Sequence, residues 1–414
     1  MDNVSSLMHG PSSVPTGVSQ QRAWTAALWL LLFFTYFQFT ITFELDAKGT
    51  LRWVYVIYPV VAMVAIRDFR FLKLSTPLVF LASFAFFNLV AYSRFGFAFE
   101  QNRKVFYIAF SATYYFVGCA MARRLPYESL LRTYRQFLLL FLCAIAAHDF
   151  VWVAQYGTDL YGNAEAEANT YVVGGLNAES QWVAILLPLL FGTGFFWWCS
   201  IFLLYLSSLY ASRAAFVFWA VLCLINGYRW VSGSVLRLTV SALVIAAMVM
   251  VFLLFFSDSQ NQLVARFSNF GTSADSGTGR LIFWGAGLLL LVQNPLGYGV
   301  GNVIDRVTNM WSGIPLDKKI DNLENLYLQM PLEAGVIPLA IYLWMIFIVI
   351  RRYRKSRDCT QIFYVMVMYW ITQNLGGGSG TDAGFWFVAG LFFTYTDPRR
   401  EKLPGPASAR PTLQ

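Results

Sequence analysis

The sequence has little charge. Only 13% of its 414 residues are Asp, Glu, Lys or Arg, whereas 57% are hydrophobic and 18% are aromatic. A soluble domain carries roughly a quarter charged residues. The shortage of charge argues against a soluble protein and predicts a polytopic membrane protein.

Histidine and cysteine are also rare. With only two histidines, His9 and His148, a histidine-based metal site is nearly excluded. The five cysteines are scattered, four of them in apolar stretches, and no CxxC pair occurs. They are therefore expected to be small buried hydrophobic residues, with no disulfide framework, no metal and no cofactor.

Long apolar runs predict about twelve membrane-spanning helices. A bilayer core of about 30 Å needs roughly 17–25 apolar residues per helix. Within 181–228 the runs are ambiguous between two and three spans. The candidate spans are 24–43, 51–66, 77–92, 105–121, 136–156, 180–196, 197–211, 214–228, 238–257, 326–350, 361–375 and 383–396.

Basic residues decide the orientation of these spans. With twelve spans and a cytoplasmic N-terminus, the basic segments RDFRFLK, ARRLPYESLLRTYR, YRWVSGSVLR, RRYRKSRD and PRREK all fall inside, as the positive-inside rule requires. Two spans in 181–228 would place the upstream basic loops outside, so three are preferred. The net charge of +8 then reflects topology, because no single basic, aromatic-lined face suggests nucleic-acid binding.

The expected organisation follows from these spans. Residues 1–23 are a polar cytoplasmic tail without the pattern of a signal peptide. Residues 24–257 hold helices one to nine, and residues 326–396 hold helices ten to twelve, followed by a cytoplasmic tail at 397–414. Between them, 258–325 forms the longest outer loop, and a long loop in a compact bundle is usually functional.

The outer loop contains a candidate anion site. In SADSGTGRLIFWGAGLLLLVQNPLGYGVGN, Ser276, Thr278 and glycines precede a helical pattern that starts near Arg280 and stops at Asn294-Pro295. A helix N-terminus attracts anions through its free N–H groups and dipole. The alternative is an interfacial helix with an ordinary cap and a snorkelling arginine. The later GYGVG cluster follows a helix, so it is not a nucleotide-binding motif.

Other charged residues lie at the outer ends of predicted spans. Arg213 interrupts the apolar stretch YASRAAFVF, and it either lines a functional cavity or snorkels to the interface. Arg94 and Arg103 are weaker candidates in an outer turn. His148 and Asp149 lie about two turns from the outer end of their span, where helix–helix hydrogen bonding is favoured over a proton relay.

Four segments, in this order, resemble the O-antigen ligase/polymerase superfamily of membrane glycosyltransferases. LNAESQWVAILLPLL resembles its Asn-containing segment, and SRAAFVFWAV its Ser-Arg-Gly-Ala element. SGTGRLIFWGAGLLLLVQNPLGYGVGN resembles its Ser-Gly-Arg…Trp…His-Pro-Leu-x-Gly-x-Gly stretch. ENLYLQMPLEAGVIP resembles its His-Asn-x-Tyr-Leu-Gln…Glu-x-Gly segment. The resemblance covers about 176–340.

The resemblance implies transfer of a glycan from an undecaprenyl-diphosphate donor at the periplasmic face of the bacterial inner membrane, with neither nucleotide nor metal. The essential arginines of the family correspond to Arg213 and Arg280. Glu324 stands where the ligases have a histidine, followed by the retained Asn325. Asn294 replaces a second histidine. The fold class it implies is an all-α integral membrane bundle of about twelve helices with one long periplasmic loop containing a short helix.

The residues suggest how this chemistry works here. Fixed arginines stabilise a departing diphosphate, and a carboxylate can activate an acceptor hydroxyl. Glu324 is the candidate base, with Asp321 as a fallback. Alternatively, Asp321 or Asn322 caps the following helix, with Glu324 in its first turn. The predicted substrate-binding residues are Asn325, Tyr327, Asp321, Asn177, Arg94 and Arg103.

The predicted function is polymerisation of lipid-linked repeat units, because both histidines of the ligases are replaced. The alternative within the family is an O-antigen ligase that uses lipid A core as acceptor. A lipid-linked oligosaccharide flippase or a non-catalytic assembly subunit is the alternative from another class. The expected partners are the lipid-linked glycan donor and acceptor, membrane lipids and a chain-length regulator.

Overall fold

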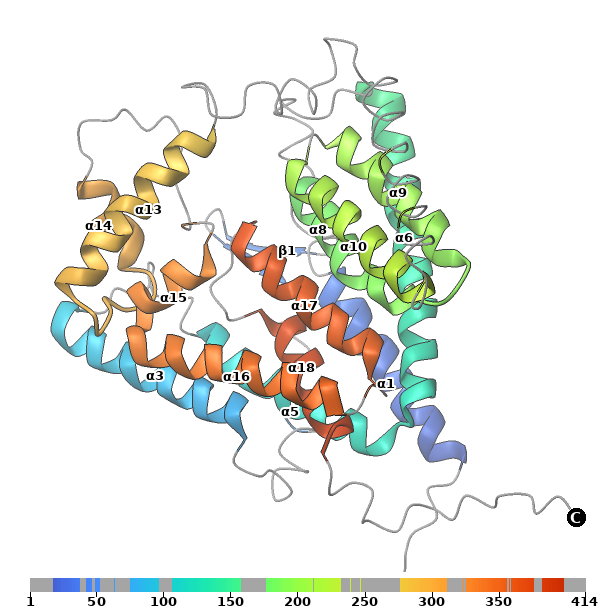
Figure 1. Ribbon diagram of the computed structural model, residues 1–414, viewed down its shortest axis with the longest axis horizontal. Coiled ribbons are helices and arrows are strands. Elements are labelled where there is room, and N and C mark those ends of the chain that lie inside the picture. Colours follow the sequence, from blue (N-terminus) through green and yellow to red (C-terminus); the bar gives the residue numbers. More distant parts are fainter. Residues whose placement is uncertain are drawn as a thin grey trace, which may run out of the picture.

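The computed structural model is almost entirely helical (Figure 1). Apart from isolated positions, it describes residues 18–37, 42–46, 49–52, 75–96, 106–157, 176–210, 212–231, 276–310, 323, 325–355, 357, 359–375 and 382–397. The strands β1 (Thr42–Asp46) and β2 (Gly49–Arg52) form one short antiparallel hairpin. The predicted span 24–43 is therefore too long at its end, since helix α1 stops at Tyr36.

The helices of the described residues mostly begin and end at proline, glycine or a polar cap. Ser75 and Pro77 precede or open α3, which ends before Gly96 at φ +85°. Pro126 precedes α6, which ends before Gly157. The helices are α1 (Val18–Tyr36), α3 (Thr76–Phe95), α5 (Phe106–Arg124), α6 (Tyr127–Tyr156), α8 (Leu176–Leu186), the 3-10 helix η3 (Leu187–Leu190), α9 (Phe195–Leu209), α10 (Arg213–Val231), α13 (Ser276–Gln293), α14 (Val303–Met310), α15 (Leu326–Ala334), α16 (Val336–Lys355), α17 (Thr360–Leu375) and α18 (Ala383–Tyr395).

Three helices are long and apolar enough to cross a membrane by length and composition. They are α3, α6 and α16, and several shorter apolar helices accompany them among the described residues. This supports a helical membrane protein. The predicted spans 51–66 and 238–257 lie almost wholly outside the described residues, so a bundle of twelve spans stays a prediction.

The ambiguous stretch 181–228 contains three helical segments. Glu179 near the start of α8 contacts Tyr210 at the end of α9. Phe191, just after η3, packs against Phe196 at the start of α9 and against Arg229 near the end of α10. The chain therefore runs down, up and down again, in the arrangement expected for three antiparallel segments.

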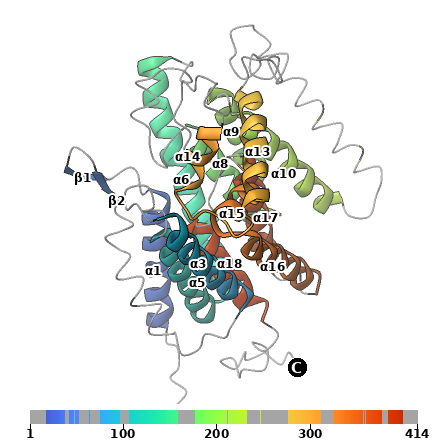
Figure 2. The same cartoon turned by 90° about the vertical axis from the view of Figure 1, so that its left-hand side faces the viewer.

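The interior of the described bundle is centred on α5 and α18. A Cβ on Gly118 would overlap the carbonyl oxygen of Phe387, and one on Gly390 would overlap that of Tyr115. Only glycine permits this close approach of two helix backbones. Around this contact, Trp386, Tyr134 and Phe137 are fully buried, and Figure 2 shows α3, α5 and α18 close together.

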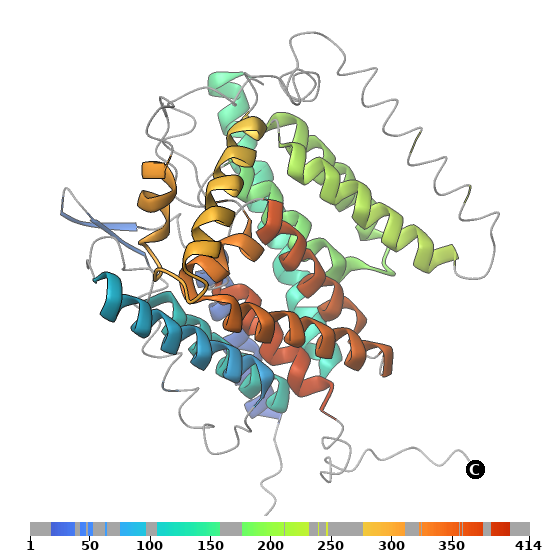
Figure 3. The same ribbon diagram turned by 60° about the vertical axis from the view of Figure 1, so that its left-hand side comes forward.

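One predicted span is wrong as a continuous helix. Residues 326–350 are divided at Gly335, where φ is +87°, into the short α15 and the long α16. A positive φ is favourable only for glycine, so Gly335 permits the break at this position. Figure 3 shows α16 lying beside α3 while α15 turns away toward α13.

Candidate functional site

The two C-terminal segments of the predicted motif set interlock through the backbone of Leu323. The indole N–H of Trp284 on α13 donates to the Leu323 carbonyl oxygen at 2.8 Å. The Leu323 N–H donates to Oε1 of Gln329 on α15 at 3.2 Å. Nε2 of Gln329 in turn donates to Glu333 Oε1 at 2.7 Å. We call this chain of contacts the Leu323 clamp, and it fixes the backbone immediately before Glu324.

Glycines bring the segment after α13 against the break between α15 and α16. The N–H groups of Tyr298 and Gly299 donate to the carbonyl oxygens of Leu332 and Glu333 at 2.7 and 2.8 Å, and Val336 N–H donates to Pro295 O at 3.0 Å. A Cβ on Gly297, where φ is +86°, would lie 2.6 Å from the Gly335 nitrogen. The GYGVG cluster is thus a site of backbone packing, which we call the glycine junction (residues 294–300 with 332–336).

Helix α3 holds this junction from the other side. Oδ1 of the buried Asn88 accepts the Val300 N–H at 2.7 Å, and the Tyr92 hydroxyl donates to Val300 O at 2.9 Å. Asn88 is fully buried, so both backbone groups of Val300 are satisfied inside the protein. The loop between α13 and α14 is therefore a rigid part of the fold.

Arginine stacking attaches α14 to the end of α3. The guanidinium of Arg306 lies 4.6 Å from the ring centroid of Phe95 and 4.8 Å from that of Tyr298, a cation–π arrangement. Burial raises the pKa of the Tyr298 hydroxyl, and the charge of Arg306 opposes this shift. The hydroxyl remains a donor, and it bonds to Leu290 O at 3.0 Å.

The structure corrects the predicted helix cap at DNLENLYLQ. Asn325 is the N-cap of α15, and its Oδ1 accepts the Leu328 N–H at 3.2 Å. Asp321 and Asn322 are therefore not the cap, and Glu324 is not in the first turn but directly before the cap. Glu324 and Asp321 themselves lie outside the described residues. Tyr327 is half-buried and packs against the main core.

The other predicted site residues are divided between two parts of the fold. Helix α13 begins at Ser276, four residues before the predicted start near Arg280, so Ser276 and Thr278 lie within the helix and do not precede it. The side chain of Arg280 is not described. Arg213 is the first residue of α10 and is partly buried. The exposed Arg94 lies with its guanidinium 5.6 Å from the Phe95 ring. Asn177 lies in α8 without a described side chain, and Arg103 lies outside the described residues.

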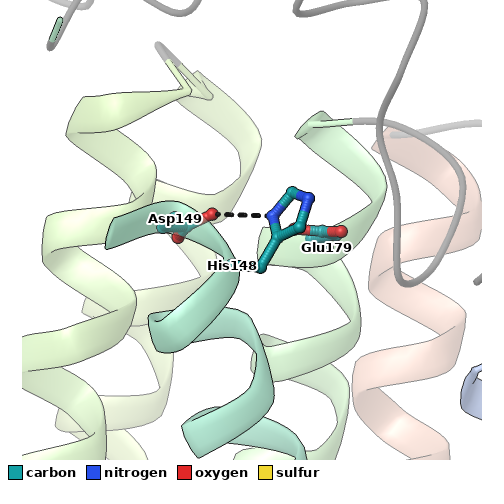
Figure 4. A group of neighbouring side chains, drawn as sticks. All are labelled: His148, Asp149 and Glu179. Atoms are coloured by element: carbon teal, nitrogen blue, oxygen red, sulfur yellow. Dashed lines mark ion pairs between the residues drawn. The ribbon is translucent and has the colours of Figure 1, made fainter. Parts of the chain in front are cut away.

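The predicted hydrogen bonding between helices is present at Asp149, and it includes Tyr210 and Glu179, which were not predicted. The Tyr210 hydroxyl contacts Asp149 Oδ1 at 2.5 Å and Glu179 Oε2 at 3.0 Å. His148 Nδ1 lies 3.6 Å from Asp149 Oδ1 (Figure 4). The only sequence signal for Glu179 was a carboxylate directly before a long uncharged run. We call these four residues the carboxylate cluster.

The carboxylate cluster has the donor set of a metal site. One ligand atom from each of His148, Asp149 and Glu179 lies within 4.8 Å of the others. One oxygen of each carboxylate, Asp149 Oδ1 and Glu179 Oε2, is engaged by the Tyr210 hydroxyl. Hydrogen bonding between α6, α8 and α9 accounts for the geometry without an ion.

Comparison with known proteins agrees with the predicted resemblance. Residues 194–343 match the family model described as O-antigen ligase. No curated protein matches the chain. The matched stretch contains Arg213, α13 with Arg280, the glycine junction and the Leu323 clamp. The match at residues 194–343 supports the O-antigen ligase/polymerase superfamily.

Proposed function

We propose that this protein is a membrane glycosyltransferase that polymerises undecaprenyl-diphosphate-linked oligosaccharide repeat units at the periplasmic face of the inner membrane. The observation that carries the proposal is the O-antigen ligase domain at 194–343, which contains both candidate arginines and the acidic segment before α15. The growing chain would leave its undecaprenyl diphosphate and join the sugar of the next lipid-linked unit.

Arg213 and Arg280 would bind the donor diphosphate. The reaction places negative charge on the departing diphosphate, and guanidinium groups stabilise this charge with paired hydrogen bonds. Arg280 lies in the second turn of α13, where the helix dipole also favours an anion. No metal is required for this stabilisation.

Glu324 would accept the proton of the acceptor hydroxyl. Asn325 already caps α15, so the proposed base is not needed for capping. The Leu323 clamp holds the preceding backbone through Trp284 and Gln329. A base must lie within hydrogen-bond reach of the proton it takes, and a fixed backbone beside Glu324 serves that need.

Two positions favour a polymerase over an O-antigen ligase. Glu324 and Asn294 stand where the ligases have histidines. Asn294 is buried, and its Nδ2 donates to Gly297 O at 2.6 Å. In this chain the Asn294 side chain therefore supports the turn at the glycine junction. Lipid A core is the acceptor in the alternative function, for which the name of the matched family is the support.

Reconstitution with purified undecaprenyl-diphosphate repeat units tests the proposal. A ladder of longer glycans without added lipid A core is the expected result. Product only when core is present would establish the ligase instead. Lipid movement across liposomes without any transfer would establish a flippase.

Two substitutions test the assigned roles in that assay. Arg280→Ala should abolish transfer while the protein still inserts, whereas Arg132→Ala, on the exposed start of α6, should have no effect. An active Arg280→Ala protein would remove Arg280 from the diphosphate site. Glu324→Gln should lower turnover by about 100-fold, as expected for loss of a general base, and near-normal turnover would exclude that role.

A further inference from the structure

The Tyr210 hydroxyl connects three helices inside the protein. Tyr210 is fully buried at the end of α9, Asp149 comes from α6 and is 3% exposed, and Glu179 comes from α8 and is fully buried. Figure 4 shows His148 and Asp149 beside Glu179 of the neighbouring helix. A hydroxyl shared by two buried carboxyl groups is costly to remove, because each group would lose a hydrogen-bond partner.

Proton counting defines this arrangement further. A hydroxyl has one hydrogen. Its oxygen contacts both Asp149 at 2.5 Å and Glu179 at 3.0 Å. Both contacts are hydrogen bonds when the two carboxyl groups hold one proton between them, because the hydroxyl then donates to the ionised group and accepts from the protonated one. Two close carboxyl groups commonly share a proton in this way. The shorter of the two contacts is the one to Asp149.

Tyr210 also begins the turn that leads to Arg213. The Tyr210 N–H donates to the carbonyl oxygens of Leu206 and Ser208, and the Ser212 N–H donates to Ser207 O at 2.9 Å. Ser212 is buried, and its Oγ accepts the Ala215 N–H at 3.4 Å at the start of α10. Arg213 thus follows a turn that is held by buried groups. Among the groups of this turn named above, the Tyr210 hydroxyl bonds to other helices.

We propose that Tyr210 is a positioning residue: its hydroxyl, shared between Asp149 and Glu179, holds the α9–α10 turn so that Arg213 can bind the donor diphosphate. The inference rests on the proposed function, since it requires that Arg213 contacts the diphosphate. Tyr210 itself would not touch the donor. Its removal should weaken donor binding without unfolding the protein.

Binding of undecaprenyl diphosphate to the full-length protein in lipid nanodiscs tests this role. Tyr210→Phe should weaken binding about 10-fold, comparable to a lost hydrogen bond to a charged group. Tyr134→Phe is the matched control, because the Tyr134 hydroxyl is also buried and has no hydrogen-bond partner among the described residues. It should bind as the wild type does. Equal binding by Tyr210→Phe and Tyr134→Phe would overturn the proposal.

A double-mutant comparison separates positioning from general stability. Arg213→Ala should weaken binding strongly, and adding Tyr210→Phe to Arg213→Ala should cause no further loss, because both changes act through one contact. Additive losses would assign Tyr210 a structural role only. Glu179→Gln should keep binding within about threefold, since the amide can still donate to the Tyr210 oxygen, whereas Glu179→Leu should resemble Tyr210→Phe.

The remaining outcomes distinguish this inference from its alternatives. Wild-type protein that neither binds undecaprenyl diphosphate nor transfers glycan would overturn the proposed function itself. Metal analysis of the purified protein should show no stoichiometric ion. One bound ion per chain that is lost in Asp149→Asn would overturn the shared-proton arrangement and establish a metal site.

Discussion

Two buried polar regions of this protein are built in opposite ways. At the glycine junction, backbone groups of residues 295–299 bond to backbone groups of 332–336, and side chains mainly stay out of the way. In the carboxylate cluster, two carboxyl side chains meet at one hydroxyl. The glycine junction has no room for an added atom, because its backbones are in close contact. The carboxylate cluster depends on hydrogen bonds between a few side chains, which substitutions can replace. We therefore expect substitutions at the glycine junction to affect folding, and substitutions in the carboxylate cluster to affect the position of Arg213.

The largest expected effect comes from breaking the junction. Gly297→Ala adds a Cβ within 2.6 Å of the Gly335 nitrogen and at φ +86°, so it should cost about 4 kcal/mol or more, or prevent folding. Gly285→Ala on α13 is the control, because its Cβ would meet no atom within 4 Å. It should stabilise the helix by about 0.5–1 kcal/mol. Thermal unfolding of both purified variants measures the difference, and equal stabilities would contradict the junction's role.

The Leu323 clamp should give the next largest effect. Gln329→Leu removes the acceptor of the Leu323 N–H and the donor to Glu333, so it should cost about 2–3 kcal/mol. Trp284→Phe removes only the indole donor and should cost about 1 kcal/mol. Because both act on Leu323, the double variant should lose less than the sum. Strict additivity in chemical unfolding would show that the two contacts are independent.

Asp382 lies outside both the glycine junction and the carboxylate cluster, and it shows how burial changes the pKa of a single carboxyl group. Asp382 caps α18, its Oδ1 accepting the Phe385 N–H at 2.8 Å. Burial raises the pKa of Asp382 to about 6, although backbone hydrogen bonds from Phe385 and Gly384 lower it. Since the pKa of the unfolded chain is about 3.9, stability from the protonated form is complete below about pH 4 and is lost as the pH rises through about 6.

The corresponding variant is Asp382→Asn, which retains a capping oxygen but does not titrate. Wild-type stability should fall by about 2 kcal/mol at most between pH 4 and pH 7, after allowance for the partial exposure of Asp382. The variant should lack this fall. Unfolding temperatures measured across that range check the difference, and parallel curves for the two proteins would remove Asp382 as the cause.

The smallest expected effect concerns the cap of α15. Asn325→Ala should cost about 1 kcal/mol, and Asn325→Asp should restore stability, because a carboxylate also caps a helix. Transfer activity provides the second measurement. If Asn325 acts only as a cap, activity should recover with Asp; stability without activity in Asn325→Asp would indicate contact with the substrate.

Several features could be read from the residues alone. The shortage of charge predicted a helical membrane protein, and the apolar runs placed α3, α5, α10, α17 and α18 within a few residues of their observed bounds. The end of α13 followed from Pro295, whereas its start at Ser276 lies four residues before the predicted start near Arg280. The predicted resemblance was confirmed by the family match at 194–343, which covers three of the four short segments. These are local or compositional properties, so neighbouring residues suffice to define them.

Other features were decided by contacts between distant segments. The apolar run 326–350 shows no break in its hydropathy, yet it divides at Gly335, where the glycine junction supplies partners for the freed backbone groups. A hydrophobic pattern indicates which residues are buried, but it does not indicate whether the helix is continuous. The prediction of one helix over 326–350 was therefore wrong. Asn325, and not Asp321 or Asn322, is the N-cap of α15.

By itself, the sequence determined the class of protein, its apolar helices and the motif positions of Arg213, Arg280 and Glu324. Only the tertiary structure decided that Tyr210 joins Asp149 to Glu179 and that Trp284 and Gln329 meet at Leu323. The physical reason is distance along the chain: these hydrogen bonds join residues on different elements. Their formation depends on how the helices pack, and no local pattern of residues reports that packing.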